Sequence, residues 1–276
     1  MTVSLSDKLN AENSGKYILS IRLLPDGLSF SCLDPTIGGK FFMDETRFDG
    51  SKPYLTSLEE YFFNNNMFSQ NYRRTRIIVV SDRYTLVPTE TLIDKEAERK
   101  RLLDFVFRRP TDFCLSNKLR TINASLLFGM DNDVYAFCKR SFGTPDFYHH
   151  LFPILRLLYR QSMNALAAVM TVIIRQETVD IVCFRQSALL FINSFNYKND
   201  ADLLYYILYV WQQVGLDQQK DGLRLWGNNK TCTNITFSLA KFIQNISLLE
   251  LPSEVYLHGA EIAHAPLDMI ALSICE

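Results

Sequence analysis

The feature that most constrains the fold is an order of predicted elements that occurs twice along the 276 residues. Each half begins with three strands joined by short turns and continues with a helix, a strand, a second helix and a last strand. The halves share this order although their residue identity is poor. Repetition of a whole unit suggests duplication and predicts two similarly built domains.

The first half opens with a predicted hairpin, because Pro25 presets a turn and Gly27 accepts positive φ. A third strand, an amphipathic helix and a wholly apolar strand typical of a sheet interior follow it. A long helix is expected to begin at the Thr144 cap, with Pro145 at its first position. The expected elements are strands 17–24, 28–34, 40–44, 76–81, 112–115, 120–128 and 134–139, and helices 54–63, 90–107 and 144–163. Asp131, Asn132 and Asp133 are expected to form the turn between the last two of these strands.

The second half shows the same pattern from residue 167 on. Asn199 or Asp200 is expected to cap its first helix, which ends at Gly215. The expected elements are strands 167–175, 178–185, 188–195, 223–227, 248–251 and 254–258, and helices 202–214 and 231–245. The sequence therefore predicts an α/β protein with mixed sheets: a loose tail at 1–15, a first domain at 16–163 and a second at 164–276.

Charge and hydropathy narrow the class of protein. The chain has 29 Lys+Arg against 30 Asp+Glu and 47% hydrophobic residues, which excludes a disordered or collagen-like chain. The basic residues of helix 90–107 alternate with acidic ones, which is typical of a solvated helix face. We therefore expect no direct contact with nucleic acid.

Apolar runs and cysteines indicate the compartment. The longest apolar stretch, 165–174, is far shorter than the roughly 20 residues of a membrane span, and the N-terminus lacks the apolar run of a signal peptide or anchor. The six cysteines are scattered, without a CxxC pair, and most have apolar neighbours. Buried reduced thiols in a cytoplasmic protein are the favoured interpretation.

The repeated order resembles that of known domains. Three meandering strands, a helix, a strand, a helix and a strand resemble the ribonuclease-H-like unit, and two such units in tandem resemble the actin-like superfamily. The stretches 172–185 and 188–195 are similar to the opening of the second domain in pilus-assembly and secretion actin-like proteins and in the related cell-division protein. They are also similar to an uncharacterised bacterial family of unknown function. The resemblance covers nearly the whole chain.

The resemblance also indicates which chemistry has been lost. In active members, one hairpin per domain holds the nucleotide phosphates with an Asp-x-Gly pattern, because Asp organises magnesium and Gly lets backbone amides approach the phosphates. At these positions this chain has Arg22 and Leu24 in the first domain and Ile173 and Arg175 in the second. The resemblance therefore implies no catalytic residues, no metal site and no cofactor.

Two interpretations remain for the arginines. Arg22 and Arg175 could converge on an interdomain cleft and bind a phosphorylated or carboxylate ligand, because guanidinium presents forked donors to such groups. Each could instead pair with an acidic neighbour. Gly227 and Asn228 follow a strand where the resemblance implies an adenine-side Gly-Gly, and a plain strand-to-helix turn is the alternative.

The histidines and the remaining sequence motifs do not indicate a metal site or a catalytic site. His149 and His150 are adjacent in the expected helix 144–163, point about 100° apart and favour a surface or interface role. The spacing of His258, Glu261 and His264 matches no zinc signature. The sequence has no Gly-x-Ser-x-Gly motif, no Walker loop and no GxGxxG, and the first strands lack the carboxylates of a ribonuclease-H nuclease.

These observations favour a non-catalytic actin-like protein that acts as a protein-interaction or assembly module. Helix 202–214 carries aromatic residues on more than one face, which favours self-association or a protein partner. The alternatives are a binder of a phosphorylated or carboxylate small molecule in the interdomain cleft, or a residual ATP-binding protein.

Overall fold

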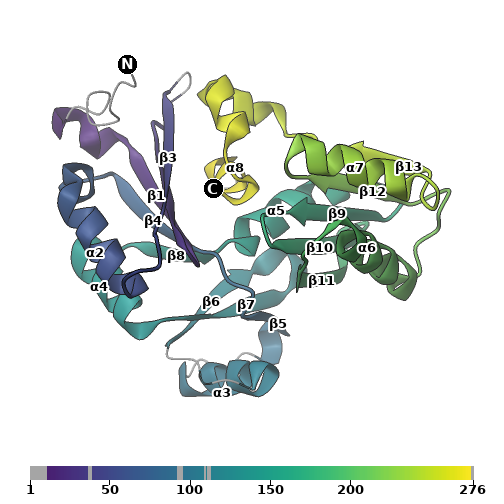
Figure 1. The fold of residues 1–276 in the computed structure, drawn as a ribbon, viewed down its shortest axis with the longest axis horizontal. Coiled ribbons are helices and arrows are strands. Elements are labelled where there is room, and N and C mark those ends of the chain that lie inside the picture. Colours follow the sequence, from purple (N-terminus) through teal and green to yellow (C-terminus); the bar gives the residue numbers. More distant parts are fainter. Residues whose placement is uncertain (1–10, 37–38, 92–95, 109, 111–112, 275–276) are drawn as a thin grey trace. The chain divides into compact units, whose positions relative to one another are not determined.

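The structure is a computed structural model that describes residues 11–36, 39–91, 96–108, 110 and 113–274. The chain divides into two compact units. Unit 1 contains residues 1–154 and 252–276, and unit 2 contains residues 155–251. Each unit contains one five-stranded mixed sheet with helices packed on it (Figure 1).

The sheet of unit 1 has the strand order β3-β2-β1-β4-β8. Its first three strands are antiparallel, and β4 and β8 continue the sheet in parallel with β1. Helices α2 and α4 lie on one side of it and contact each other through Phe62 and Phe137 (Figure 1). The bounds are β1 Ile18–Leu24, β2 Gly27–Leu33, β3 Phe41–Arg47, α2 Tyr54–Asn64, β4 Arg74–Val79, α4 Asn132–Phe142 and β8 Asp146–His149.

Between β4 and α4 the chain builds a small insertion with a sheet of its own, in the order β5-β7-β6. Helix α3 covers this sheet because Leu103 packs against Val87, Cys114 and Leu127. The bounds are β5 Tyr84–Pro88, α3 Glu96–Phe107, β6 Phe113–Leu119 and β7 Ala124–Met130.

Unit 2 repeats the architecture of unit 1 without an insertion. Its sheet has the order β11-β10-β9-β12-β13, which matches that of unit 1 strand for strand. Gln186 and Ser187 both have positive φ and form the tight turn between β10 and β11. The bounds are β9 Val169–Ile174, β10 Thr178–Arg185, β11 Ala188–Asn196, α6 Asp200–Val214, β12 Gly222–Trp226, α7 Asn229–Leu239 and β13 Asn245–Leu248.

The repeated topology confirms the predicted mixed α/β fold of two tandem units. In unit 2, α6 and α7 bury Ile207 and Ile235 against the apolar face of β9 and β10. The remaining helices are α5 Leu151–Ser162 and α8 Leu267–Ile274, and the 3-10 helices are η1 Ala11–Lys16, η2 Asn66–Ser69, η3 Thr89–Thr91, η4 Arg120–Ile122, η5 Ser253–His258 and η6 Ala260–His264. Among the described residues, no helix is both long and apolar enough to cross a membrane.

Several elements differ from the sequence prediction. Strand β5 and helix α8 were not predicted, the expected strand 248–251 overlaps β13 only at Leu248, and the expected helix 231–245 ends at Leu239. Residues 134–139 belong to helix α4, not to a strand, because Asp131 is not a hairpin turn but an N-cap that accepts from the backbone N–H groups of Asp133 and Val134, both at 2.9 Å. Residues 146–149 form strand β8, which pairs with β4, so the predicted helix 144–163 begins only at Leu151. The expected strand 254–258 is the 3-10 helix η5.

The boundaries of the units also differ from the predicted ones. Residues 252–276 were expected in the second domain with 164–251, but they group with unit 1. Residues 155–163, expected in the first domain, group with unit 2. Of the predicted tail 1–15, residues 11–15 lie in η1, and residues 1–10 lie outside the described part of the chain.

Candidate functional site

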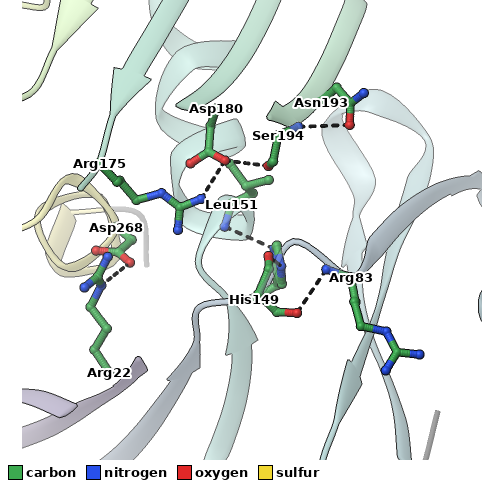
Figure 2. A network of polar contacts seen from close by, with 10 residues as sticks. Arg22, Arg83, His149, Leu151, Arg175, Asp180, Asn193, Ser194 and Asp268 are labelled. Carbon is green, nitrogen blue, oxygen red and sulfur yellow. Dashed lines mark hydrogen bonds and ion pairs between the residues drawn. The ribbon is translucent and has the colours of Figure 1, made fainter. Parts of the chain in front are cut away.

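Arg22 lies on β1 and is only 7% exposed. Its Nε donates to Oδ2 of Asp268 at 2.6 Å, and Asp268, in the first turn of α8, is 2% exposed (Figure 2). The other carboxylate oxygen of Asp268 accepts from the backbone N–H of Met269 at 2.9 Å. The charge of Arg22 is therefore neutralised by a carboxylate within unit 1.

The turn that follows Arg22 is engaged by neighbouring groups. The carbonyl of Asp26 accepts from the backbone N–H of Phe48 at 2.8 Å, and the carboxylate of Asp26 pairs with Arg47. The Tyr54 hydroxyl, whose pKa is raised by burial, donates to the carbonyl of Gly27 at 3.0 Å. Leu24, at the position where the resemblance implies glycine, is buried. The protein thus packs and hydrogen-bonds its own first hairpin turn.

Arg175 occupies the corresponding turn of unit 2, directly after β9. Its Nη2 donates to Oδ1 of Asp180 at 2.8 Å, and the Ser194 hydroxyl donates to the same oxygen at 2.5 Å (Figure 2). Asp180 is fully buried, whereas the side chain of Arg175 is 17% exposed. The Tyr197 hydroxyl donates to the carbonyl of Arg175 at 2.5 Å. A buried carboxylate therefore holds this arginine as well.

Gly227 and Asn228 have local structural roles. Gly227 follows β12 with φ of 157°, and a Cβ there would lie 2.8 Å from the carbonyl oxygen of Ile174. Only glycine allows this close approach between the two strand ends. Asn228 is the N-cap of α7, and its side-chain oxygen accepts from the backbone N–H of Lys230 at 2.9 Å.

The structure brings together three of the four predicted site residues. Gly227 lies against Ile174, which directly precedes Arg175, so both residues and the adjoining Asn228 lie at one end of the unit 2 sheet. Arg22 belongs to unit 1 and lies under α8.

Two residues essential to this arrangement were not predicted as site residues. Asp180 is an acidic residue within the apolar part of β10, a pattern that itself indicates a buried charged partner. Asp268 is separated from Arg22 by 246 residues, and no local pattern connects the two.

Nucleophilic and metal-binding groups are buried or dispersed. The five described cysteines are free and buried, and burial raises the pKa of Cys138 to about 12, which disfavours the reactive thiolate. Cys275 lies outside the described residues. Nowhere in the described ranges do three His, Cys, Asp or Glu side chains gather in a way that could hold a metal ion.

The adjacent histidines require a correction. They lie at the end of β8 and in the turn before α5, not in a helix, and both are buried rather than at the surface. The Nε2 of His149 is 2.9 Å from the carbonyl oxygen of Ser81, and its Nδ1 accepts from the backbone N–H of Leu151 at 3.3 Å (Figure 2). These contacts fit a neutral imidazole protonated at Nε2 that connects β8 to the start of α5.

Comparison with known proteins agrees with the fold. Residues 6–246 match the family model described as "Protein of unknown function (DUF3822)". No curated protein matches the chain. A crystal structure of a Bacteroides thetaiotaomicron protein "with actin-like ATPase fold and unknown function" is similar at a TM-score of 0.84 and 28% identity, over 97% of this chain and 99% of that chain.

A second solved structure has a similar fold at lower sequence identity. A structure of the "PilM-PilN type IV pilus biogenesis complex" is similar at a TM-score of 0.56 and 11% identity, over 94% of this chain and 97% of that chain. At this identity the likeness concerns the fold alone. The chain belongs to the DUF3822 family of proteins of unknown function and has an actin-like ATPase fold.

Proposed function

We propose that this protein is a non-catalytic member of the actin-like fold and acts as a protein-interaction or assembly module. The observation that carries the proposal is the replacement of both phosphate hairpins' Asp-x-Gly patterns by Arg22 with Leu24 and by Ile173 with Arg175. Magnesium is bound by oxygen ligands, and arginine or isoleucine supplies none. The residues of both hairpins therefore do not fit a magnesium triphosphate.

The contacts of the two hairpins support the same conclusion. Restoring a phosphate site would require freeing Arg22 from Asp268 and removing the buried Leu24 side chain. In unit 2 it would require displacing Arg175 from Asp180. Displacing either arginine opposes its ion pair with a buried carboxylate, and removing one partner of such a pair costs about 3–5 kcal/mol.

Exposed apolar side chains support an interaction role. On α6, Tyr205 is 60% exposed and stacks on Tyr209, their ring centroids 5.8 Å apart. On α3, Leu102, Phe105 and Val106 project from one helix face, and Phe105 is 82% exposed. Exposed apolar patches of this kind are typical of protein contacts.

Isothermal titration calorimetry with Mg-ATP and Mg-ADP tests the loss of nucleotide binding. We expect no binding heat, because the residues at the Asp-x-Gly positions of the two hairpins supply no magnesium ligand and leave no open approach for phosphate. Micromolar affinity for either nucleotide would contradict the proposal and support the residual ATP-binding alternative. A phosphorylated metabolite that binds in the absence of magnesium, and loses affinity in Arg175→Met, would support the anion-binding alternative.

A further inference from the structure

Strand β11 forms an edge of the unit 2 sheet and lacks the features that usually protect such an edge. Proteins block exposed sheet edges with charged side chains, proline, short strands or covering groups. β11 is nine residues long and contains no charged residue and no proline. In the described part of the chain it pairs with β10 on one side only. Its outer side can therefore accept another strand.

The other edge strands are protected. Charged residues or proline occur in three of them: Asp44, Glu45 and Arg47 in β3, Lys118 in β6 and Pro88 in β5. The remaining two, β8 and β13, have only four residues each. On β8 the Asn117 side chain also takes the place of a further strand, because it donates to the carbonyl of Phe147 at 2.9 Å and accepts from the backbone N–H of His149 at 2.8 Å. Among the edge strands of the described ranges, β11 is therefore the exception.

The register of β11 shows which of its backbone groups face outward. A bulge at Leu190 interrupts the pairing with β10, so the regular part of the strand is 191–196. The backbone N–H of Ser194 donates to the side chain of Asn193 at 2.9 Å, which directs this N–H away from β10 (Figure 2). Because paired and unpaired residues alternate along an edge strand, the backbone groups of Ile192 face outward as well. The Asn193 side chain thus occupies a donor that a further strand would use.

The regular part of β11 is complementary to itself in an antiparallel arrangement. A two-fold axis through Asn193 places Phe191 of one copy opposite Phe195 of the other. It also places Ile192 opposite Ser194, the two residues whose backbone groups face outward, and such residues exchange both of their hydrogen bonds. Cross-strand aromatic pairs stabilise a sheet, and no like charges meet in this register. The chemistry of this edge therefore fits a second copy of the same strand.

Aromatic residues of α6 continue from this edge. Phe195 stacks on Tyr206, with ring centroids 4.6 Å apart, and the ring of Tyr206 lies 5.4 Å from that of Tyr205. Tyr205 and Tyr209 are 60% and 47% exposed. A second copy related by the two-fold axis places its own α6 on the same side of the joined sheet. The aromatic residues of α6 therefore add apolar area next to the paired strands.

We propose that β11 pairs with β11 of a second copy of this chain, antiparallel about a two-fold axis at Asn193, and joins the two unit 2 sheets into one. The inference rests on the interaction role proposed above and names its partner. A contact of the same surface on both copies is closed, so it yields a dimer. In the free chain the Asn193 side chain satisfies the N–H of Ser194, and it gives way when the second strand arrives.

Mixing of charged variants tests the two-fold axis. Asn193→Asp and Asn193→Lys each place two like charges directly opposite each other across the axis. We expect sedimentation velocity to show that either variant alone dimerises roughly fivefold more weakly than the unchanged protein. An equimolar mixture is expected to recover dimerisation, because unlike charges then meet. A mixture that associates no better than its components, or an unchanged protein that stays monomeric, would refute the pairing.

Leu248→Asp and Leu248→Lys are the matched controls. Leu248 is 57% exposed and lies on β13, at the opposite edge of the same sheet. We expect both variants to dimerise as the unchanged protein does, alone and mixed. Equal weakening in these controls would show a general effect of added charge and overturn the assignment to β11.

Ile192→Pro tests the backbone pairing. Proline removes an N–H that faces away from β10, so the hydrogen bonds within the unit 2 sheet are kept. We expect Ile192→Pro to lose dimerisation, and Ile192→Ala, which keeps the N–H, to retain it. Circular dichroism checks that both variants fold. Dimerisation that persists in folded Ile192→Pro would contradict the proposal.

Hydrogen exchange of the unchanged protein provides a test that requires no variant. We expect the amide of Ile192 to exchange more slowly as the protein concentration rises, because pairing with the second copy protects it. The amide of Leu248, on the opposite edge, is expected to exchange at a constant rate. Exchange at Ile192 that does not depend on concentration would refute the proposal even if Ile192→Pro does not fold. This result would leave the absence of nucleotide binding, which calorimetry tests, unaffected.

Discussion

At the scale of single residues, Arg22 stands where the resemblance implies Asp and Arg175 stands where it implies Gly, and this protein supplies the balancing carboxylates from within. Asp180 comes from the strand beside Arg175, and Asp268 comes from the far end of the sequence. Both aspartates are buried. A buried ion pair adds little net stability, but breaking it is costly because one charge is left without compensation in a low dielectric.

Asp180→Ala tests how much the ion pair between Arg175 and Asp180 contributes to the free energy of unfolding. We expect the free energy of unfolding to fall by about 3 kcal/mol, since Arg175 and Ser194 both lose the carboxylate oxygen that they share. Urea denaturation followed by circular dichroism measures this loss. Glu60→Ala, which breaks the half-exposed pair with Lys52, is the control and is expected to cost less than about 1 kcal/mol. Equal losses in the two variants would mean that burial adds nothing to the Asp180 pair.

At the scale of elements, the strands and helices that were wrongly predicted lie where local and tertiary signals compete. Asp131 was interpreted as part of a hairpin turn, although the same residue followed by an apolar periodic segment also predicts an N-cap. Residues 146–149 carry a helix-start signal, but pairing with β4 makes them a strand. Helix α3 was predicted to expose a charged face to solvent. The structure shows that it also exposes the apolar side chains of Leu102, Phe105 and Val106.

The exposed apolar side chains of α3 (Leu102, Phe105 and Val106) lead to a prediction about assembly. We expect sedimentation velocity to show self-association that weakens in the triple variant Leu102→Ser, Phe105→Ser, Val106→Ser, because these side chains project outward. Leu103 and the partly buried Phe107 pack on the inner face and are unchanged in this variant. Phe63→Ser, at an 89% exposed residue of α2, is the matched control and is expected to associate as the unchanged protein does. A protein that remains monomeric at all concentrations would exclude self-association and leave a different protein partner.

At the scale of the whole molecule, unit 2 is built from one continuous segment, whereas unit 1 also needs residues 252–276. The ion pair between Arg22 and Asp268 joins residues 246 positions apart, so the β1 face is complete only once α8 has docked. Both units also bury free thiols: Cys32 and Cys138 lie in unit 1 and Cys183 in unit 2. The free energy of unfolding at alkaline pH therefore depends on buried thiols in both units.

Burial raises the pKa of Cys32, Cys138 and Cys183 from an ordinary value of about 9 to about 12. Between these values the folded protein keeps protons that the unfolded chain releases, so the free energy of unfolding falls as pH rises. The fall reaches about 1.4 kcal/mol per pH unit for each thiol. Melting temperatures measured from pH 7.5 to 10.5 are expected to decline less steeply in Cys138→Ala than in the unchanged protein. Identical slopes would show that this thiol does not contribute.

The sequence by itself determined the repeated strand and helix order, because hydrophobic periodicity, turn residues and caps are local signals that act within a few residues. It also determined that the acidic and glycine positions of both hairpins are gone, since this is a matter of residue identity. Only the tertiary structure decided that β8 is a strand, that residues 252–276 belong to unit 1 and that Asp268 balances Arg22. These depend on contacts between residues far apart in the chain, for which no local pattern carries information.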